Sequence, residues 1–440
     1  MDNFTERAFL VGIEIRGSRP LLSVEDSLEE LKLLADTAGM TVVGQAYQRL
    51  NRIVPGTFIG PGKVEEIKET ITNLPADVVI FDDELSPRHQ RELEEAFGEN
   101  IKVLDRSALI LDIFAQHATT HEGRLQVELA QYEYRLPRLT RQWTHLARQA
   151  GGGGGRSGNG GVGLRGPGET QLEVDRREVG RRISKLKEEL ENVRGHRQRQ
   201  RQQREKAGLP VIALVGYTNA GKSTLLNTLT GADIYVANQL FATLDPTTRK
   251  TVLPGGKAVL FSDTVGFIQK LPTTLIAAFR ATLEGINEAD LLLHVVDATH
   301  TNLMEQLEAV EDTLAEIDVP RIPKILVLNK IDMAEGGKPD TEKFASLGYS
   351  AIVGVSALEK IGIQDLLQAV EDVMKTTLVP IRVLLPYSQG ELLSWIHTRG
   401  VVDREEHTQE GVLIEAHLPA RAVQRVEQFF ESTSPDIEEI

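Results

Sequence analysis

Two stretches of the sequence place glycine, lysine and carboxylate residues directly after apolar runs. The first follows Val211–Val215 and has the pattern GxxxxGKS. In that pattern the glycines let successive backbone N–H groups turn toward a β-phosphate, the lysine reaches the β- and γ-phosphates, and the serine hydroxyl can ligate Mg²⁺. The stretch consists of Gly216, Tyr217, Thr218, Asn219, Ala220, Gly221, Lys222 and Ser223. It predicts a phosphate-binding loop between a strand and a helix.

The second stretch follows Ile325–Leu328 and consists of Asn329, Lys330, Ile331 and Asp332. A carboxylate at Asp332 can accept hydrogen bonds from guanine N1–H and N2–H₂, a pair of donors that adenine lacks. Leaving a buried acid half satisfied costs on the order of 1 to 3 kcal/mol, which is enough to select GTP over ATP. The backbone of a third stretch, Ser356, Ala357 and Leu358, can meet guanine O6.

An acidic motif lies between these stretches in the chain. Asp263, Thr264, Val265 and Gly266 follow the apolar run Ala258–Phe261. The acid can hold Mg²⁺ through a water molecule, and the glycine N–H can contact a γ-phosphate. Four motifs in this order, each after an apolar run, predict a translation-factor-like P-loop GTPase that uses Mg²⁺.

The segment that orders around the γ-phosphate must lie between the phosphate loop and Asp263. The candidate residues are Phe241, Ala242, Thr243, Leu244, Asp245, Pro246, Thr247 and Thr248. One threonine should ligate Mg²⁺, and spacing alone leaves Thr243, Thr247 and Thr248 open.

The residue after Gly266 bears on catalysis. Ras-like enzymes place there the glutamine that orients the attacking water, whereas this chain has Phe267. An aromatic ring cannot orient water, and its simplest interpretation is packing beneath a switch loop. The motifs therefore assign no certain catalytic side chain, and we expect slow intrinsic hydrolysis.

The composition is that of a water-soluble, multidomain protein. The chain has 440 residues, 41% of them hydrophobic and 26% charged, and no cysteine. Disulfides, thiolate zinc sites and cysteine nucleophiles are excluded. The acidic start and the lack of a long apolar stretch predict no signal peptide or membrane span, so we expect a cytoplasmic protein, and a monomer.

Changes of pattern along the chain predict a multidomain α/β fold. Strands and helices alternate over residues 1–115, which predicts an N-terminal α/β domain. Heptad spacing over 116–208 predicts a long antiparallel helical hairpin, kinked at Pro137, with a glycine-rich tip loop at 151–168. Residues 209–376 are expected to form the GTPase domain with a mostly parallel sheet, and 377–440 a small C-terminal α+β module of β-α-β-β-α order.

The predicted hairpin is basic although the chain carries a net charge of −15. Residues 121–208 hold 19 Lys and Arg against 11 Asp and Glu, a net charge of +8, which leaves −23 for the rest. RNA phosphates are therefore the expected partner, contacted by arginines at the tip and along the helices; the alternative is a solvated basic coiled coil. The candidate contacts are Arg156, Arg165, Arg176 and Arg177, with Arg135, Arg138, Arg141, Arg148, Arg181 and Arg182 beside them.

Nearly the whole chain resembles the HflX-type GTPases, a bacterial family of ribosome-associated enzymes. The motifs that carry the resemblance are Gly163–Thr170 leading into Asp175-Arg176-Arg177, then GYTNAGKS, then Phe241–Asp245 and Asp263–Phe267. The resemblance implies Ser223 and Thr243 as the Mg²⁺ ligands and a hydrophobic residue at Phe267 as normal for the family. Leu358 departs from the general pattern of P-loop GTPases, many of which have at this position a lysine whose stem stacks on guanine.

The resemblance also implies that the hairpin tip approaches the large (50S) ribosomal subunit and its rRNA near the peptidyl-transferase region, and that the GTP form dissociates or rescues stalled 70S ribosomes. Two alternatives stay open. The first is a GTPase for 50S subunit assembly, and the second is a nucleotide-dependent RNA-remodelling protein whose GTP site is regulatory.

Two further stretches are weaker candidates for functional sites. The stretch Gly56–Val64 is rich in glycine but has the wrong spacing for a second phosphate loop, so we interpret it as a strand-to-helix turn, with Lys63 as a less favoured phosphate contact. His117 and His121 lie one helical turn apart without a third ligand nearby, which favours a structural role.

Overall fold

The computed structural model divides the chain into two compact units. It describes residues 5–18, 20–98, 100–139, 167–206, 209–231, 240–241, 247–270, 286–287, 289–317, 319, 322–334, 341–376, 378–419, 423 and 425–430. The first unit comprises residues 1–194, 237–245 and 268–281, and the second comprises 195–236, 246–267 and 282–440. Each unit is described by itself below.

The first unit contains a four-stranded parallel sheet of order β2-β1-β3-β4. Its strands are β1 (Arg7–Ile15), β2 (Thr41–Leu50), β3 (Val78–Phe81) and β4 (Lys102–Asp105). All four residues of β3 are buried because both faces of the sheet are covered, which is the usual condition of parallel sheets. The predicted N-terminal α/β sheet is therefore present.

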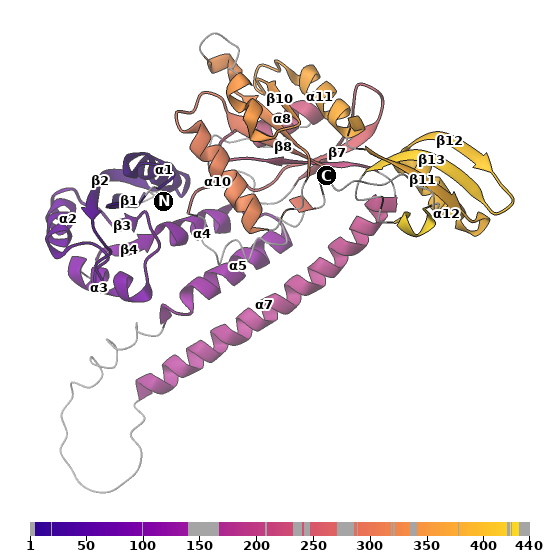
Figure 1. Cartoon of the computed structure of the whole chain (residues 1–440). Helices are drawn as coiled ribbons and strands as arrows, with labels where there is room; N and C mark the ends of the chain where they lie inside the picture. The colour runs from indigo at the N-terminus through magenta and orange to yellow at the C-terminus, as the bar shows by residue number, and fades with distance from the viewer. Residues whose placement is uncertain are drawn as a thin grey trace, which may run out of the picture. The chain divides into compact units, whose positions relative to one another are not determined.

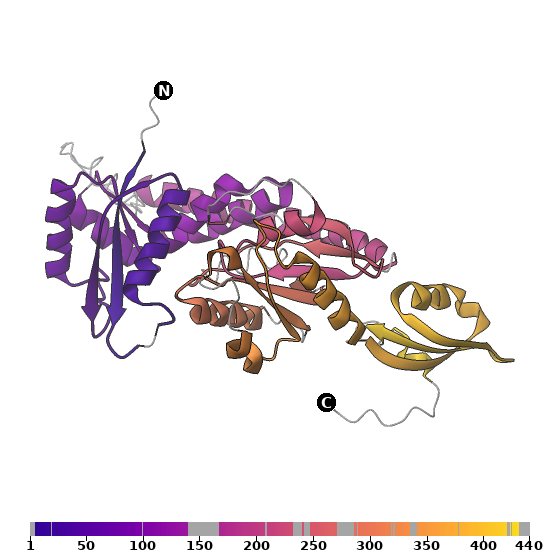
Figure 2. The same cartoon turned by 90° about the horizontal axis from the view of Figure 1, so that it is seen from above.

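Helices cover both faces of this sheet. The helices α2 (Pro61–Asn73) and α3 (Pro87–Phe97) pack on one face, and α1 (Val24–Thr37) and α4 (Arg106–His117) lie together on the other (Figures 1 and 2). Side-chain oxygens of Ser23, Ser86 and Asp105 accept from backbone N–H groups in the first turns of α1, α3 and α4. Such N-caps fix where each helix begins.

Helix α5 (His121–Arg135) and the part of α7 (Pro167–Lys206) up to Arg194, both in the first unit, lie side by side. Helix α5 ends two residues before Pro137, where the kink is predicted, and residues 140–166 lie outside the described part of the chain. Helix α7 is 40 residues long. A small apolar cluster joins the two helices; it consists of Leu125, Leu129, Tyr132, Ile183, Leu186, Leu190 and Val193. The predicted heptad positions thus form this contact. The predicted tip loop lies outside the described residues, except for the start of α7.

The second unit contains a six-stranded sheet of order β10-β9-β8-β5-β7-β6, parallel except for the pair β6–β7. Its strands are β5 (Val211–Val215), β6 (Thr248–Val252), β7 (Ala258–Ser262), β8 (Leu291–Asp297), β9 (Lys324–Asn329) and β10 (Ala351–Gly354). The predicted motifs follow β5, β7, β9 and β10. Because carboxyl ends of parallel strands meet at one edge, the motifs gather there.

Helices α8 (Lys222–Thr230) and α11 (Ile363–Thr376) pack on one face of this sheet around Leu225, Leu226 and Leu366. Helix α10 (Leu303–Glu316) and the 3₁₀ helix η3 (Thr341–Leu347) pack on the other face through Leu307 and Phe344. A further 3₁₀ turn, η2 (Ile331–Met333), follows β9.

The C-terminal part of the second unit is a three-stranded antiparallel sheet of order β11-β13-β12. Its elements are β11 (Leu378–Leu385), the 3₁₀ turn η4 (Tyr387–Gln389), α12 (Gly390–Arg399), β12 (Val401–His407) and β13 (Val412–Pro419). Its order agrees with the prediction as far as β13. Of the predicted final helix at 420–430, Val423 is helical and Glu427–Phe429 form the 3₁₀ turn η5, while 420–422 and 424 lie outside the described residues.

Candidate nucleotide-binding site

The phosphate loop joins β5 to α8, as its motif requires. Gly221 directly precedes α8 and has a φ of 92°, a conformation that strongly favours glycine. A Cβ at this position would collide with the side-chain amide of Asn329. The glycine is therefore required both by the turn and by the close approach of the guanine motif.

Lys222 is held within the loop itself. Its Nζ donates to the carbonyl oxygens of Gly216 at 3.0 Å and Tyr217 at 2.7 Å, and the residue is 6% exposed. Burial lowers the pKa of Lys222 to about 8, although Asp263 acts in the opposite direction. Near pH 8 a fraction of these lysines is therefore neutral, and an anionic ligand would stabilise the charged form.

The two residues expected at a magnesium site lie together. Ser223 Oγ donates to Asp263 Oδ2 at 2.7 Å, and Asp263 is 1% exposed. The hydroxyl of Thr264 donates to the carbonyl of Leu214 at 2.6 Å, which ties this motif to the end of β5. A hydroxyl and a carboxylate oxygen in contact form a donor set of the kind that Mg²⁺ prefers.

The segment after Asp263 pairs with the phosphate loop through its backbone. Thr218 N–H donates to the carbonyl of Phe267 at 2.7 Å, and Phe267 N–H donates to the carbonyl of Gly216 at 3.1 Å. A Cβ at Gly266 would lie 2.9 Å from Thr218 Cγ2 and 3.2 Å from Lys222 Nζ. Gly266 is therefore beside the P-loop lysine, while Phe267 is 2% exposed and serves as a packing residue.

Asn329 connects three of the four motifs. Its Nδ2 donates to the carbonyl of Ala220 at 2.9 Å, and its Oδ1 accepts from the N–H of Ala357 at 3.0 Å. Lys330 has a φ of 63°, and its Nζ contacts Asp297 Oδ2 at 2.7 Å. Burial raises the pKa of Asp297, but the contacts with Lys330 and Thr299 outweigh it and leave the pKa lowered.

The remaining guanine-motif residues differ in exposure. Asp332 is exposed, and Ser356 is buried with its Oγ accepting from Glu359 N–H at 3.1 Å. Leu358 and Met333 are 72% and 69% exposed, which is unusual for large apolar side chains and suits stacking on a planar base.

The predicted switch segment is described only at its ends. Ala242, Thr243, Leu244, Asp245 and Pro246 lie outside the described residues, and Thr247 and Thr248 lead into β6. The ring of Phe241 packs edge-on against Phe114 of α4 with centroids 4.6 Å apart.

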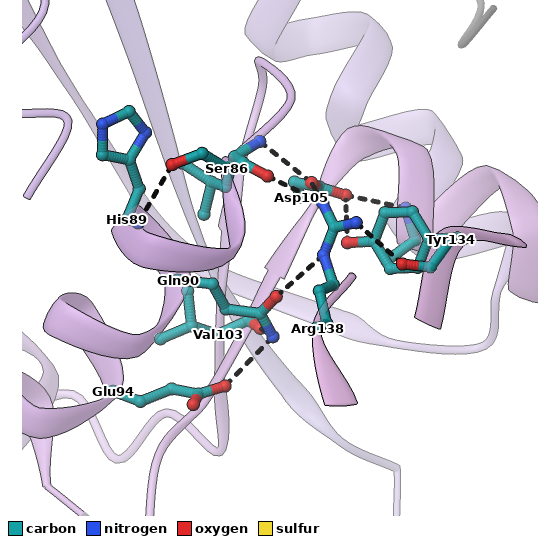
Figure 3. Close-up of polar contacts among 10 residues, drawn as sticks. Ser86, His89, Gln90, Glu94, Val103, Asp105, Tyr134 and Arg138 are labelled. Carbon is teal, nitrogen blue, oxygen red and sulfur yellow. Dashed lines mark hydrogen bonds and ion pairs between the residues drawn. The ribbon is translucent and has the colours of Figure 1, made fainter. Parts of the chain in front are cut away.

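The sequence predicts that Arg138 faces RNA, and the structure corrects this. Its guanidinium donates to the Leu85 carbonyl at 2.7 Å, lies 3.3 Å from Asp105 Oδ2 and lies 3.5 Å above the Tyr134 ring (Figure 3). Tyr134 donates to Asp105 Oδ1 at 2.9 Å, and burial, with the Asp105 charge, raises the pKa of its hydroxyl. Arg138 therefore stabilises the segment at the C-terminal end of α5.

The arginines of α7 differ from one another. Arg182 makes two hydrogen bonds of 2.8 Å to Glu128 on α5. Arg176, Arg177 and Arg181 are exposed, and they have no ion pair with any residue that the structure describes. Arg141, Arg148, Arg156 and Arg165 lie outside the described residues.

The weaker candidates have protein partners. Lys63 Nζ lies 2.7 Å from Glu66 on α2, and His117 Nδ1 contacts the carbonyl of Ile113 at 2.8 Å. Across the described ranges, no three His, Asp or Glu residues are grouped as a metal site would require. No helix among those described is long and apolar enough to cross a membrane.

Four family models match consecutive parts of the chain. They are "GTP-binding GTPase N-terminal" over residues 25–115, "GTP-binding GTPase Middle Region" over 117–204, "50S ribosome-binding GTPase" over 211–330 and "HflX C-terminal domain" over 344–434. Curated relatives extend this match to nearly the full length. GTPase HflX of Caldanaerobacter subterraneus is 46% identical over 96% of this chain and 94% of its own.

The chain belongs to the HflX family of GTPases. GTPase HflX of Escherichia coli is 42% identical, with 94% of both chains covered. Among solved structures, a complex of SsGBP with GDP aligns with 84% of this chain and 99% of its own at 25% identity, with a TM-score of 0.47. The HflX match agrees with the predicted family, fold class and GTPase activity.

Sequence reasoning missed two features of this HflX-family site. The side-chain amide of Asn329 forms hydrogen bonds with two other motifs. The position of Asn329 at the end of a strand would have indicated these contacts only with the strand order known. Lys270 and Gln269, just after the acidic motif, bind residues near the N-terminal sheet, and no local pattern indicated their partners.

Proposed function

We propose that this HflX-family GTPase binds the 50S ribosomal subunit and dissociates or rescues stalled 70S ribosomes when GTP is bound. The observation that carries the ribosome partner is the match of residues 211–330 to a model described as a 50S ribosome-binding GTPase. Exposed arginines of α7 support it, because guanidinium groups in contact with solvent can neutralise RNA phosphates.

We infer the roles of the site residues from the same geometry. Lys222 and the loop N–H groups from Gly216 to Ser223 bind the phosphates, and Asp332 accepts from the guanine edge while Leu358 covers the base. Mg²⁺, when bound, neutralises charge between the β- and γ-phosphates. Its proposed protein ligands are Ser223 and Thr243, with Asp263 acting through water.

We propose that hydrolysis is slow until a partner acts. Phe267 is buried and cannot orient water. What this chain supplies is therefore positioning and charge: Lys222 toward the phosphates and the Gly266 N–H toward the γ-phosphate. Ordering of the switches by the ribosome would complete the site, and such a site acts as a timed switch.

Sedimentation of 70S ribosomes tests the proposal. The protein is added with GTP, a non-hydrolysable GTP analogue, GDP or ATP, and the fractions of 70S, 50S and 30S particles are measured. We expect splitting with GTP and with the analogue but not with GDP or ATP, because binding rather than hydrolysis selects the splitting conformation.

Other outcomes favour the alternatives. Preferential binding to immature 50S particles without splitting would indicate subunit assembly. Duplex RNA unwinding that survives Asp332→Asn would indicate an RNA-remodelling protein with a regulatory GTP site. Either result, with intact 70S ribosomes under all four nucleotides, would contradict the splitting function while leaving the GTPase assignment in place.

A further inference from the structure

A group of charged side chains lies beneath the carboxyl end of β3. Asp82 follows β3 and is 1% exposed, and Arg106 Nη1 donates to its Oδ1 at 2.7 Å. Ser27 at the start of α1 donates to Asp82 Oδ2 at 2.6 Å, and Arg106 also pairs with Glu30. Asp83 is adjacent in the chain. We call Ser27, Glu30, Asp82, Asp83 and Arg106 the Asp82 cluster.

The cluster stands where doubly wound sheets bind ligands. In the order β2-β1-β3-β4, the chain leaves β1 toward one side of the sheet and reaches β3 on the other side. The carboxyl ends of β1 and β3 therefore flank the topological switch point, the usual ligand position in open α/β sheets. Ser27 lies in the first turn of α1, the helix that follows β1, and Asp82 directly follows β3, so the connections after both strands contribute.

A lysine from outside the N-terminal sheet occupies this position. Lys270 Nζ lies 2.5 Å from Asp82 Oδ2 and 2.7 Å from Asp83 Oδ1. Gln269 Nε2 donates to Ser27 Oγ at 2.9 Å. The cluster holds three acids against one arginine, so a second cation offsets buried negative charge.

The pKa values of the two aspartates agree with this geometry. Burial raises the pKa of Asp82, but Arg106 and Lys270 outweigh burial and leave the pKa lowered. For Asp83, burial is the largest cause, and the pKa remains raised although Lys270 acts against it. The positive charge of Lys270 thus favours the ionised form of both carboxylates.

Lys270 belongs to the segment that senses the nucleotide. It follows Gly266 by four residues and Phe267 by three, and Phe267 pairs through its backbone with the phosphate loop. The segment from Ile268 onward groups with the first unit, whereas Phe267 groups with the second. Only three residues therefore separate Gly266 in the second unit from Lys270 in the first.

The other switch flank is held in the same unit. The Phe241 ring packs against Phe114 of α4, and Leu240 N–H contacts Thr37 Oγ1 of α1 at 3.3 Å. Leu240 and Phe241 are 5% and 3% exposed. Phe241 precedes Thr243 by two residues, so both flanks of the predicted nucleotide sensors are bound by helices or loops of the N-terminal domain.

Backbone strain marks both attachment points. Phe241 has a φ of 57° and Lys270 a φ of 54°, in the left-handed region that is unfavourable for a non-glycine residue. Such conformations persist only where surrounding contacts stabilise them. Here the Phe114 ring and the Asp82 cluster supply those contacts.

Gly266 is in turn placed to receive a γ-phosphate. A Cβ added at Gly266 would lie 3.2 Å from Lys222 Nζ, so the residue is close to the lysine. The Gly266 N–H has no hydrogen-bond acceptor among the residues that the structure describes. We propose that Lys270 is a positioning residue for GTP: its binding to the Asp82 cluster fixes the Gly266 N–H beside the phosphate loop, which favours GTP over GDP. GDP lacks the phosphate that this N–H would bind.

Nucleotide affinities of the full-length protein test the proposal. Lys270→Met keeps the side-chain length and removes the charge. We expect affinity for a non-hydrolysable GTP analogue to fall about tenfold, within the usual range of coupling between sites, while affinity for GDP stays within about twofold. Lys270→Arg keeps a cation beside the carboxylates and should restore the preference for the GTP analogue.

Two comparisons separate positioning from general damage. Lys250→Met removes an exposed lysine of β6 and should change neither affinity. Asp83→Asn should weaken analogue binding alone but add little to Lys270→Met, because both changes remove one interaction. Equal losses for GDP and the analogue, or an unchanged analogue affinity, would overturn the proposal.

Discussion

The charge of Lys222, and with it the affinity for nucleotide, is expected to depend on pH. Its pKa is lowered to about 8 by burial, so about half of these lysines are neutral at pH 8 before a nucleotide binds. Bound phosphates favour the charged form and raise the pKa, so binding must take up protons near pH 8. Raising the pH through this range therefore weakens binding.

Calorimetry can measure this proton uptake. GDP is titrated with excess Mg²⁺ in buffers of different ionisation enthalpy, and the slope of the heat against that enthalpy gives the protons exchanged. We expect about 0.5 proton taken up at pH 8 and about 0.1 at pH 7. No uptake at pH 8 would mean that the lysine is already fully protonated.

The meeting of the motifs at one edge of the sheet was predictable from sequence, because each motif is short and directly follows a strand. Ser223 and Asp263 are expected at one magnesium site and lie 2.7 Å apart. The partners of Lys270 were not predictable, since Asp82 is 188 residues away and neither local sequence indicates the other. The charge of a side chain indicates the sign of its partner but not the position of that partner in the chain.

Among the elements, the C-terminal end of α5 shows most clearly that a pattern of charges in the sequence does not identify the partner of each charged side chain. The sequence groups Arg138 with arginines expected to contact RNA, yet it contacts the Leu85 carbonyl and a carboxylate on β4. The helices and strands themselves followed from apolar periodicity, and α5 ends two residues before Pro137, where the sequence predicts a kink. Whether an arginine's acceptor is RNA or its own chain depends on tertiary packing.

Replacing Arg138 should loosen this element. In Arg138→Met, the buried Asp105 keeps its hydrogen bonds from Tyr134, Leu85 and Ala108 but loses its cation. Because breaking a buried ion pair is strongly destabilising, we expect the opening free energy of α5 amides to fall by about 3 kcal/mol. Hydrogen exchange measures this directly.

The matched control for that prediction is Arg135→Met. Arg135 is exposed at the last position of α5, three residues before Arg138, and a surface substitution of this kind changes stability by about 0.5 kcal/mol or less. Equal protection of α5 in the two variants would contradict the role assigned to Arg138.

For the whole molecule, the central question raised by the proposed function is how an acidic protein would bind an RNA surface. The net charge of −15 opposes such binding at long range, while the excess of basic residues is confined to 121–208. Within the described part of that stretch, arginines fall into two kinds: those neutralised by the protein, such as Arg182 with Glu128, and those exposed, such as Arg176 and Arg177. Only the second kind can release counterions when RNA binds.

This distinction predicts a difference in salt dependence. Binding of the GTP-analogue form to 50S subunits is measured from about 50 to 200 mM salt, and the slope of log affinity against log salt is compared between variants. Arg176→Ala with Arg177→Ala should reduce the slope by about 2, one unit for each phosphate that the protein no longer neutralises. Arg182→Ala should leave the slope nearly unchanged, because Glu128 already satisfies that guanidinium. If Arg182→Ala lowers the slope as much per residue as the exposed pair, the total charge of α7 governs binding and the pattern of ion pairs within the protein does not.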